Sequence, residues 1–179
     1  MVSNMGQRGK KDHQKRLCEM SEKYRGFYDL TEDLIARLKT AGCAVVTFGD
    51  VPDYMRSAKN PVTPGGHISP IGFSTGDINL VQLEIFVYDL TTLVKLDVEQ
   101  SANPIYGDNN TIDNLDTCMS VIDAFMRPIQ DRTVQIEEGG YYRVQNSPQW
   151  NSVYENGDIR ISGWIGTVTF SLQNYTSSC

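Results

Sequence analysis

The chain of 179 residues is long enough for one domain with a sizeable hydrophobic core, whereas two full domains would be cramped. Apolar residues make up 40% of the chain and charged residues 21%, the proportions of an ordinary globular protein. A formal net charge of −6 argues against a general nucleic-acid binder, since phosphate contacts need clustered cations, and no apolar run approaches the ~20 residues of a membrane span.

The N-terminal segment, residues 1–27, is expected to be a basic extension. Lys and Arg are concentrated in residues 8–16, and no apolar stretch accompanies them, so a signal peptide is not expected. Apolar side chains then recur at helical spacing, at Leu17, Met20, Tyr24 and Phe27. This spacing predicts a helix over about residues 10–25. A solvated terminus is the simplest interpretation, and contact with an acidic partner or with nucleic acid is the alternative.

A single domain is expected over residues 28–172, and it begins with a helix. Asp29 followed by Glu32 resembles a capping box. The apolar positions of one helix face are Leu30, Leu34, Ile35, Leu38 and Ala41. Gly42 supplies a stop, and the β-branched run at residues 43–48 predicts a buried strand.

Residues 49–77 are predicted to form a protruding arm, either a long loop or an extended hairpin, between the first two strands. The stretch contains four prolines and five glycines. Structureless loops longer than about 15 residues are uncommon in compact domains unless they have a function. Candidate contacts with other subunits are Tyr54, Met55, Arg56, Lys59, His67, Ile68, Ile71 and Phe73. We expect deletion of residues 52–74 to leave the fold intact.

The next strong elements are a strand and a helix. Residues 79–90 alternate with period two, which predicts a strand with one apolar and one mixed face. Residues 91–110 are ambiguous, with a short strand or helix possible at 92–98. Residues 111–127 carry an apolar stripe at helical spacing, with Asn110 or Thr111 as the cap.

The last quarter predicts strands at residues 141–145, 149–154 and 158–172. Asn156-Gly157 is typical of a tight hairpin turn. Apolar positions change parity within residues 163–166, which predicts a bulge or bend. Residues 173–179 form a polar tail. The fold class that follows is α+β, an antiparallel or mixed sheet packed by two main helices.

The sequence contains no catalytic constellation. It has two histidines: His13 lies in the basic N-terminal segment, and His67 has no neighbouring carboxylates or cysteines; neither HExxH nor CxxC occurs. The four cysteines are widely spaced, so free thiols are expected, with Cys43 and Cys118 in the core. We therefore predict no catalytic, cofactor-binding or metal-binding residues, and not an enzyme.

The order of elements resembles the tail terminator, or tail completion, proteins of tailed bacteriophages. Four segments carry this resemblance: DLIARLKTAG (33–42), VQLEIFVYDL (81–90), NTIDNLDTCMSVIDAFMRPI (110–129) and GDIRISGWIGTVTFSL (157–172). Residues 28–172 match the family's order of helices and strands, whereas the basic segment before residue 28 has no counterpart in it. The resemblance is one of hydrophobic pattern and order, with no invariant signature.

This resemblance implies a structural virion protein of the tail or neck. Members of the family form rings, typically hexameric, that cap the tail tube, stop its polymerisation and present a surface to the head-side connector or stopper protein. The implied partners are other copies of the chain, the tail-tube protein and that connector. Genome DNA would pass through the lumen without specific binding, and no cofactor or membrane is involved.

Other functions remain as alternatives. Within the same class, the chain could be another neck component, such as a head-completion or stopper protein. From different classes, it could be a cytosolic enzyme or small-molecule-binding protein, or a basic-armed nucleic-acid accessory protein, which the balance of charge disfavours.

Overall fold

The computed structural model describes most of the predicted domain, in six stretches. These are residues 26–50, 62–76, 78–91, 110–136, 140–156 and 160–172. The predicted helix at 10–25, the ambiguous segment at 92–98 and the tail at 173–179 lie outside the described residues.

Two helices and seven strands make up the described part of the chain. In order they are α2 (Phe27–Ala41), β1 (Val45–Phe48), β2 (Gly65–Ser74), β3 (Asn79–Leu90), α5 (Thr111–Met126), β4 (Thr133–Gln135), β5 (Tyr141–Val144), β6 (Trp150–Asn156) and β7 (Arg160–Leu172). The predicted strand at 79–90 is confirmed to the residue, and the predicted helix at 111–127 is confirmed to within one.

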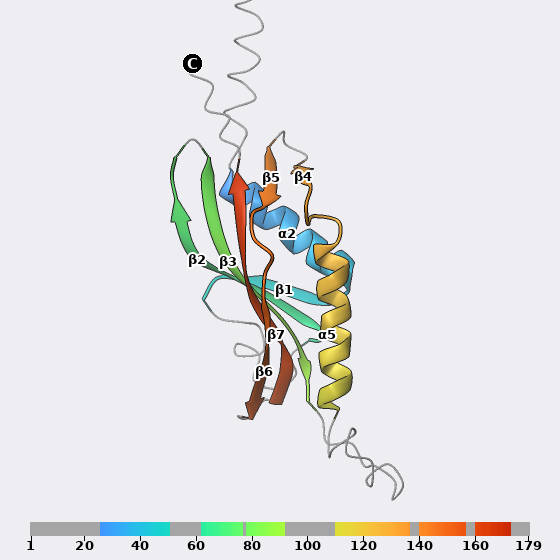
Figure 1. Cartoon of the computed structure of the whole chain (residues 1–179). Helices are drawn as coiled ribbons and strands as arrows, with labels where there is room; N and C mark the ends of the chain where they lie inside the picture. The colour runs from blue at the N-terminus through green and yellow to red at the C-terminus, as the bar shows by residue number, and fades with distance from the viewer. Residues whose placement is uncertain are drawn as a thin grey trace, which may run out of the picture.

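The strands form one mixed, curled sheet in the order β1-β2-β3-β7-β5-β4, with β6 also paired to β7. β1 runs parallel to β2, and the other pairs are antiparallel. Figure 1 shows both helices on the same side of this sheet, with α5 lying against the central strands β3 and β7. The α+β architecture predicted from the sequence is thus confirmed.

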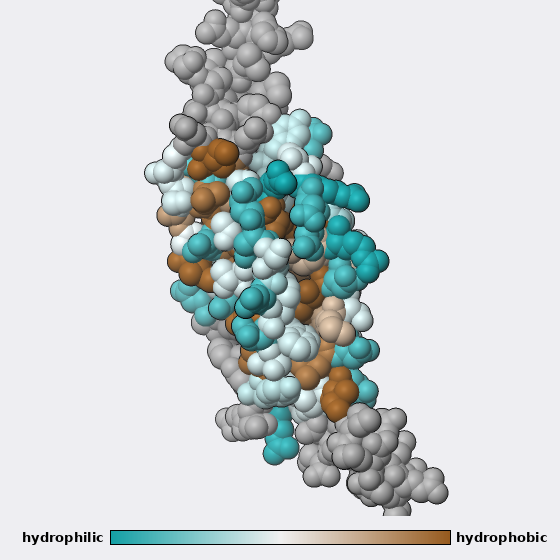
Figure 2. Space-filling model, viewed as in Figure 1, coloured by the Kyte–Doolittle hydropathy of each residue, from teal (hydrophilic) through white to brown (hydrophobic). Residues whose placement is uncertain are grey.

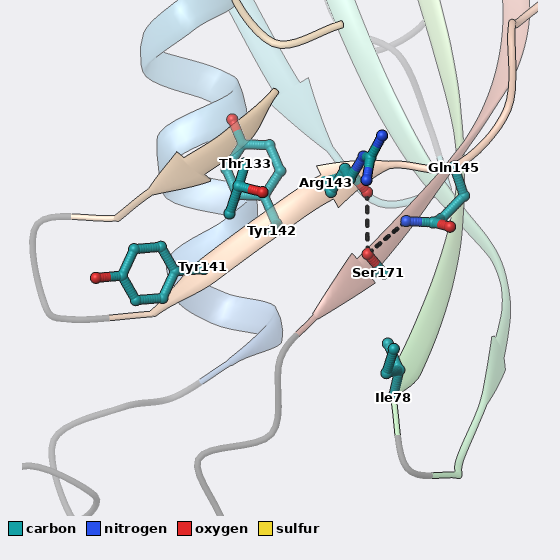
Figure 3. A pocket seen from close by; sticks show the side chains of 7 residues that line it. All are labelled: Ile78, Thr133, Tyr141, Tyr142, Arg143, Gln145 and Ser171. Atoms are coloured by element: carbon teal, nitrogen blue, oxygen red, sulfur yellow. Dashed lines mark hydrogen bonds between the residues drawn. The ribbon is translucent and has the colours of Figure 1, made fainter. Parts of the chain in front are cut away.

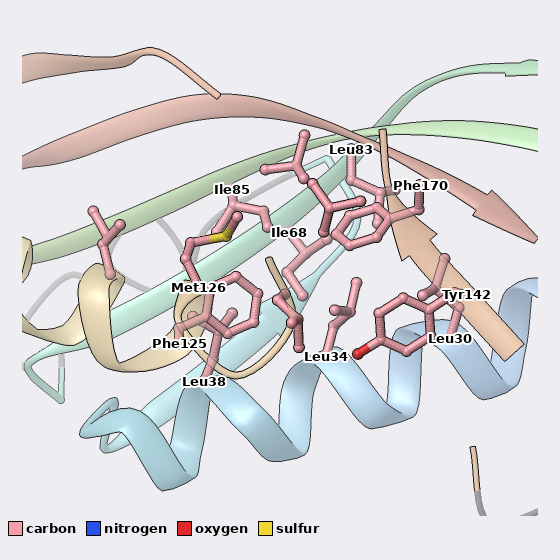
Figure 4. Close-up of a cluster of buried hydrophobic side chains, with 14 of the residues drawn as sticks. Leu30, Leu34, Leu38, Ile68, Leu83, Ile85, Phe125, Met126, Tyr142 and Phe170 are labelled. Carbon is pink, nitrogen blue, oxygen red and sulfur yellow. The ribbon is translucent and has the colours of Figure 1, made fainter. Parts of the chain in front are cut away.

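The main hydrophobic core fills the space between the helices and the sheet. Figure 4 shows Leu30, Leu34 and Leu38 of α2 directed toward the sheet, where they meet side chains from β2, β3 and β7. Phe125 and Met126 close the core from α5. The helical spacing of these residues is what places them on one buried face. Cys43 and Cys118 belong to the same core as free thiols, as predicted.

The start of α2 differs from the prediction. The helix begins at Phe27, after Gly26, so Asp29 lies in the first turn and is buried, and it does not serve as the N-terminal cap. In the first turn, the carboxylate of Asp29 interacts favourably with the positive end of the helix dipole. This interaction explains why an acidic residue stands at the start of the helix although it is not the cap. Asn110 precedes α5 without capping it through its side chain, which instead donates to Asn114 Oδ1 and to the carbonyl oxygen of Leu90.

The predicted bulge in the last strand is wrong. β7 pairs with β3 in continuous register from Asn79↔Leu172 to Leu90↔Ile161. The parity of the apolar positions changes because β7 contributes to two clusters on opposite faces. Val168, Phe170 and Leu172 face the helices, whereas Ile161 joins Phe86 and Tyr88 in a second buried cluster. The predicted hairpin between β6 and β7 is confirmed, with register Asn156↔Arg160.

The prediction of a protruding arm, a long loop or an extended hairpin, over residues 49–77 between the first two strands is wrong for residues 65–74. Residues 65–74 form β2, which lies inside the sheet between β1 and β3. Its glycines are needed for packing. A Cβ at Gly65 would overlap the Tyr88 ring, and one at Gly66 would lie 3.1 Å from Cys43 Sγ. Deletion of residues 52–74 would therefore remove a sheet strand and part of the core, so the expectation of an intact fold is also wrong.

Candidate interaction surface

The structure divides the eight predicted contact residues into three groups. Tyr54, Met55, Arg56 and Lys59 lie outside the described residues. His67 and Ile68 are buried in the first half of β2, so they are not available as surface contacts. Ile71 and Phe73, in the second half of the same strand, are exposed.

His67 has a structural role in the sheet. It is 4% exposed, and its Nδ1 shares a hydrogen bond of 2.8 Å with the Thr47 hydroxyl of β1, whose direction depends on the ring tautomer. His67 and Thr47 are also register partners in the parallel β1–β2 ladder. Ile68, on the opposite face, packs fully into the main core. The prediction of His67 and Ile68 as surface contacts is wrong for one reason: the first half of β2 lies inside the sheet, where successive side chains are buried on opposite faces.

The exposed side chains gather at the far end of the β2–β3 hairpin. Ile71, Phe73 and Ile78, which we call the hairpin patch, are 51%, 63% and 52% exposed. Figure 2 shows apolar surface concentrated over this end of the hairpin, next to a mostly polar sheet face. Ile78 was not among the predicted contacts, because it follows the turn where the predicted arm ends. An apolar residue close to Gly76, between two segments of strand-like pattern, was the signal that could have identified it.

The hairpin end is held rigidly although it projects. Phe73 pairs with Val81 and Ser74 with Leu80 in the β2–β3 ladder. β3 in turn pairs with β7 along its whole length. The register shifts between Pro70 and Gly72, so the strand bends where it leaves the body of the sheet. The hairpin patch is consequently presented on a fixed support.

An open depression of about 310 Å³ adjoins the hairpin patch through Ile78. Figure 3 shows the other lining side chains coming from β4, β5, β7 and the residue after β5: Thr133, Tyr141, Tyr142, Arg143, Gln145 and Ser171. Gln145 Nε2 donates to Ser171 Oγ at 2.7 Å, and Ser171 Oγ donates to the Arg143 carbonyl oxygen at 3.3 Å. Arg143 is the only charged residue of this lining.

Beneath the depression, a polar contact joins the sheet to α2. The Tyr142 hydroxyl donates to Asp33 Oδ2 at 2.7 Å, and Arg37 Nε donates to the same oxygen at 2.6 Å. Burial, followed by the hydrogen bond to Asp33, raises the pKa of Tyr142 well above its ordinary value. The phenol therefore stays protonated, and its role here is structural.

A second polar cluster fixes the start of α5. Asn114 is buried, and its Nδ2 donates to the Leu90 carbonyl oxygen at 2.8 Å and to Ser162 Oγ at 3.0 Å. Thr91 Oγ1 also donates to Ser162 Oγ, at 3.0 Å. These bonds join the end of β3, the first turns of α5 and β7. All of them lie within the protein, so this cluster positions the helix.

In the part of the chain that the structure describes, no group of three or more His, Cys, Asp or Glu side chains could hold a metal ion. Neither described helix is long and apolar enough to cross a membrane. The chain matches no protein-family model, and no curated protein is significantly similar to it.

Proposed function

We propose that this protein is a structural subunit of the tail or neck of a tailed bacteriophage, and specifically the tail terminator. In this role, copies of the chain form a closed ring, expected to be hexameric, that caps the tail tube and ends its polymerisation. The opposite face of the ring then meets the head-side connector or stopper protein. Genome DNA passes through the lumen without specific binding.

One observation carries the proposal beyond the resemblance in sequence pattern. The hairpin patch places three large apolar side chains on a rigid hairpin end, each at least half exposed. Grouped exposed apolar side chains are typical of a surface that binds another protein. A ring subunit needs such a surface, because every copy must contact its neighbours and the partners above and below. The α+β fold with both helices on one sheet face agrees with the architecture that the resemblance implies.

The test is to measure the mass and shape of the assembled protein. Size-exclusion chromatography with light scattering should give a particle of several 20.1 kDa chains, alone or after addition of a tail-tube protein. Negative-stain microscopy should then show closed rings that bind the ends of tubes and shorten them. A protein that stays monomeric at high concentration and ignores the tube protein would contradict the proposal.

A further inference from the structure

The hairpin patch lies beside an unpaired strand edge. The β1–β2 ladder ends at Phe48↔Ile68, and Gly49 closes it by donating from its backbone N to the Ile68 carbonyl oxygen at 3.0 Å. Ser69 Oγ then donates to the Gly49 carbonyl oxygen at 3.0 Å. Beyond this point, residues 70–74 pair with β3 on one side and with no described strand on the other. Such an edge presents backbone N–H and C=O groups that another strand can use.

A second unpaired edge lies on the other side of the central strands. β6 pairs with β7 through all of residues 150–156, and no other described strand pairs with it. Asn151, Ser152 and Tyr154 are exposed along it, the last by 54%. These two edges belong to different strands and are separated by β3 and β7, whereas the outer edges of β1 and β4 end the described strand order.

The two edges carry few of the charged side chains that usually prevent strands from pairing between molecules. Residues 70–74 read PIGFS, without a charge, and β6 reads WNSVYEN, in which Glu155 is the single charged residue. Lysines and other charges are the common protection of exposed edges, and prolines are another. Pro70 has no N–H to donate, so it restricts intermolecular pairing to the residues that follow it. No like charges would oppose each other if these two edges met.

The two edges also match in the faces on which they carry their aromatic side chains. Phe73 is the register partner of Val81, which belongs to the helix-facing core. Tyr154 is the register partner of Ser162, whose hydroxyl is bonded by Asn114 of α5 on that same face. If the sheet continued from one copy to the next, Phe73 and Tyr154 would lie on one common face. Aromatic pairs across neighbouring strands are among the more stabilising pairs in sheets.

We propose that residues 71–74 of one copy pair with β6 of the next copy, so that the sheet continues from subunit to subunit. This inference rests on the proposed ring and names the contact that builds it. Because the two edges differ, the contact is heterologous, and heterologous contacts generate closed rings or open helices. Because the pairing is short, it forms few backbone hydrogen bonds. The apolar side chains of the hairpin patch therefore supply additional buried area to this contact.

The test is disulfide crosslinking between variants that each carry one added cysteine in a Cys18→Ser, Cys179→Ser background, in which Cys43 and Cys118 remain as buried thiols. A mixture of Phe73→Cys and Tyr154→Cys proteins should crosslink into dimers under mild oxidation, several-fold more than either variant alone. The double variant should form a ladder of crosslinked species that ends at the ring size. Met119→Cys, with a side chain 53% exposed on α5, is the matched control for random collision. Circular dichroism should confirm that every variant is folded.

The other outcomes separate the contact from the function. If Phe73→Cys alone crosslinks as well as the mixture, the contact is isologous and the head-to-tail pairing is wrong. If light scattering shows rings but crosslinking does not exceed the Met119→Cys control, the pairing is wrong and the ring function stands. A protein that remains monomeric under every condition overturns both.

Discussion

Tyr142 of β5 donates a hydrogen bond of 2.7 Å to Asp33 of α2, although 109 residues separate the two in the chain. The bond ties the first helix to a short strand near the edge of the sheet. Tyr142 also packs edge-on against Phe170, with ring centroids 5.7 Å apart. This one side chain thus links α2, β5 and β7.

Replacing Tyr142 by Phe should keep the ring contact and remove the hydrogen bond. Hydrogen bonds to a charged acceptor are net stabilising, so we expect Tyr142→Phe to lower the free energy of unfolding by about 1.5 kcal/mol. Urea unfolding followed by circular dichroism measures this change. In a double-mutant cycle with Asp33→Ala, the two effects should not add, because each variant removes one partner of the same bond. Additive effects would show that the bond contributes nothing to stability.

Two isoleucines three residues apart in β2 should respond differently to truncation. Ile68 is fully buried in the main core, whereas Ile71 is half exposed in the hairpin patch. We expect Ile68→Ala to cost about 2–5 kcal/mol of stability and Ile71→Ala less than about 0.5 kcal/mol. Thermal unfolding of the two variants in the monomeric state provides the comparison. Equal, small effects would mean that residues 65–70 are not part of the core.

The same strand shows where reasoning from sequence reached its limit. β3 and α5 were predictable because each carries one uninterrupted apolar period, in Val81 to Val87 and in the stripe that includes Cys118 and Phe125. β2 was not, because Gly65, Gly66 and Pro70 are residues that normally indicate a loop. These three residues are explained by contacts with distant parts of the chain, which the local sequence does not reveal. The two glycines let the strand approach Tyr88 and Cys43, and Pro70 lies where the β1 ladder has ended.

The candidate surface was predictable only in part, for a related reason. Ile71 and Phe73 could be singled out because apolar residues in a segment that looked irregular have no core to join. The same argument wrongly included His67 and Ile68, since it could not detect that the chain enters the sheet at Gly65. The edge of β6 gave no signal, because whether a strand has one neighbour or two depends on topology.

Alkaline pH should destabilise the fold through the thiols of Cys43 and Cys118, which are buried in the described core. Burial raises the pKa of Cys43 and of Cys118 from 9.0 to about 12, with the charge of Asp89 adding to the shift at Cys118. The unfolded chain releases these protons first, so stability is retained below pH 9 and is lost as the pH rises toward 12. At about pH 10, ionisation of each thiol in the unfolded chain should lower the free energy of unfolding by about 1 kcal/mol.

Urea unfolding at about pH 8 and about pH 10 measures this loss, and variants identify its source. Cys118→Ala should lower stability at both pH values, because it leaves a space in the core, but the stability that it loses between the two pH values should be about 1 kcal/mol smaller than in the unmodified protein. Tyr142, whose pKa is also raised, acts in the same direction at higher pH. An unchanged pH dependence in the cysteine variant would contradict the assignment.

Gly163 should be the glycine least tolerant of substitution, because the backbone of the neighbouring strand occupies the space where a side chain would stand. A Cβ at this position would overlap the Val87 carbonyl oxygen and lie 2.7 Å from Tyr88 Cα. Both groups belong to β3, which is paired with β7 at this point, so neither can withdraw without breaking the ladder. We expect Gly163→Ala to cost more than about 3 kcal/mol or to prevent folding, as overpacking against fixed backbone does. Gly76→Ala is the matched control, since its Cβ would lie 3.7 Å from the nearest atom, the Ile78 carbonyl oxygen. If chemical unfolding gave the two variants similar stabilities, the close approach of β7 to β3 at Gly163 would be wrong, and with it the continuous register that places Phe73 and Tyr154 on one face.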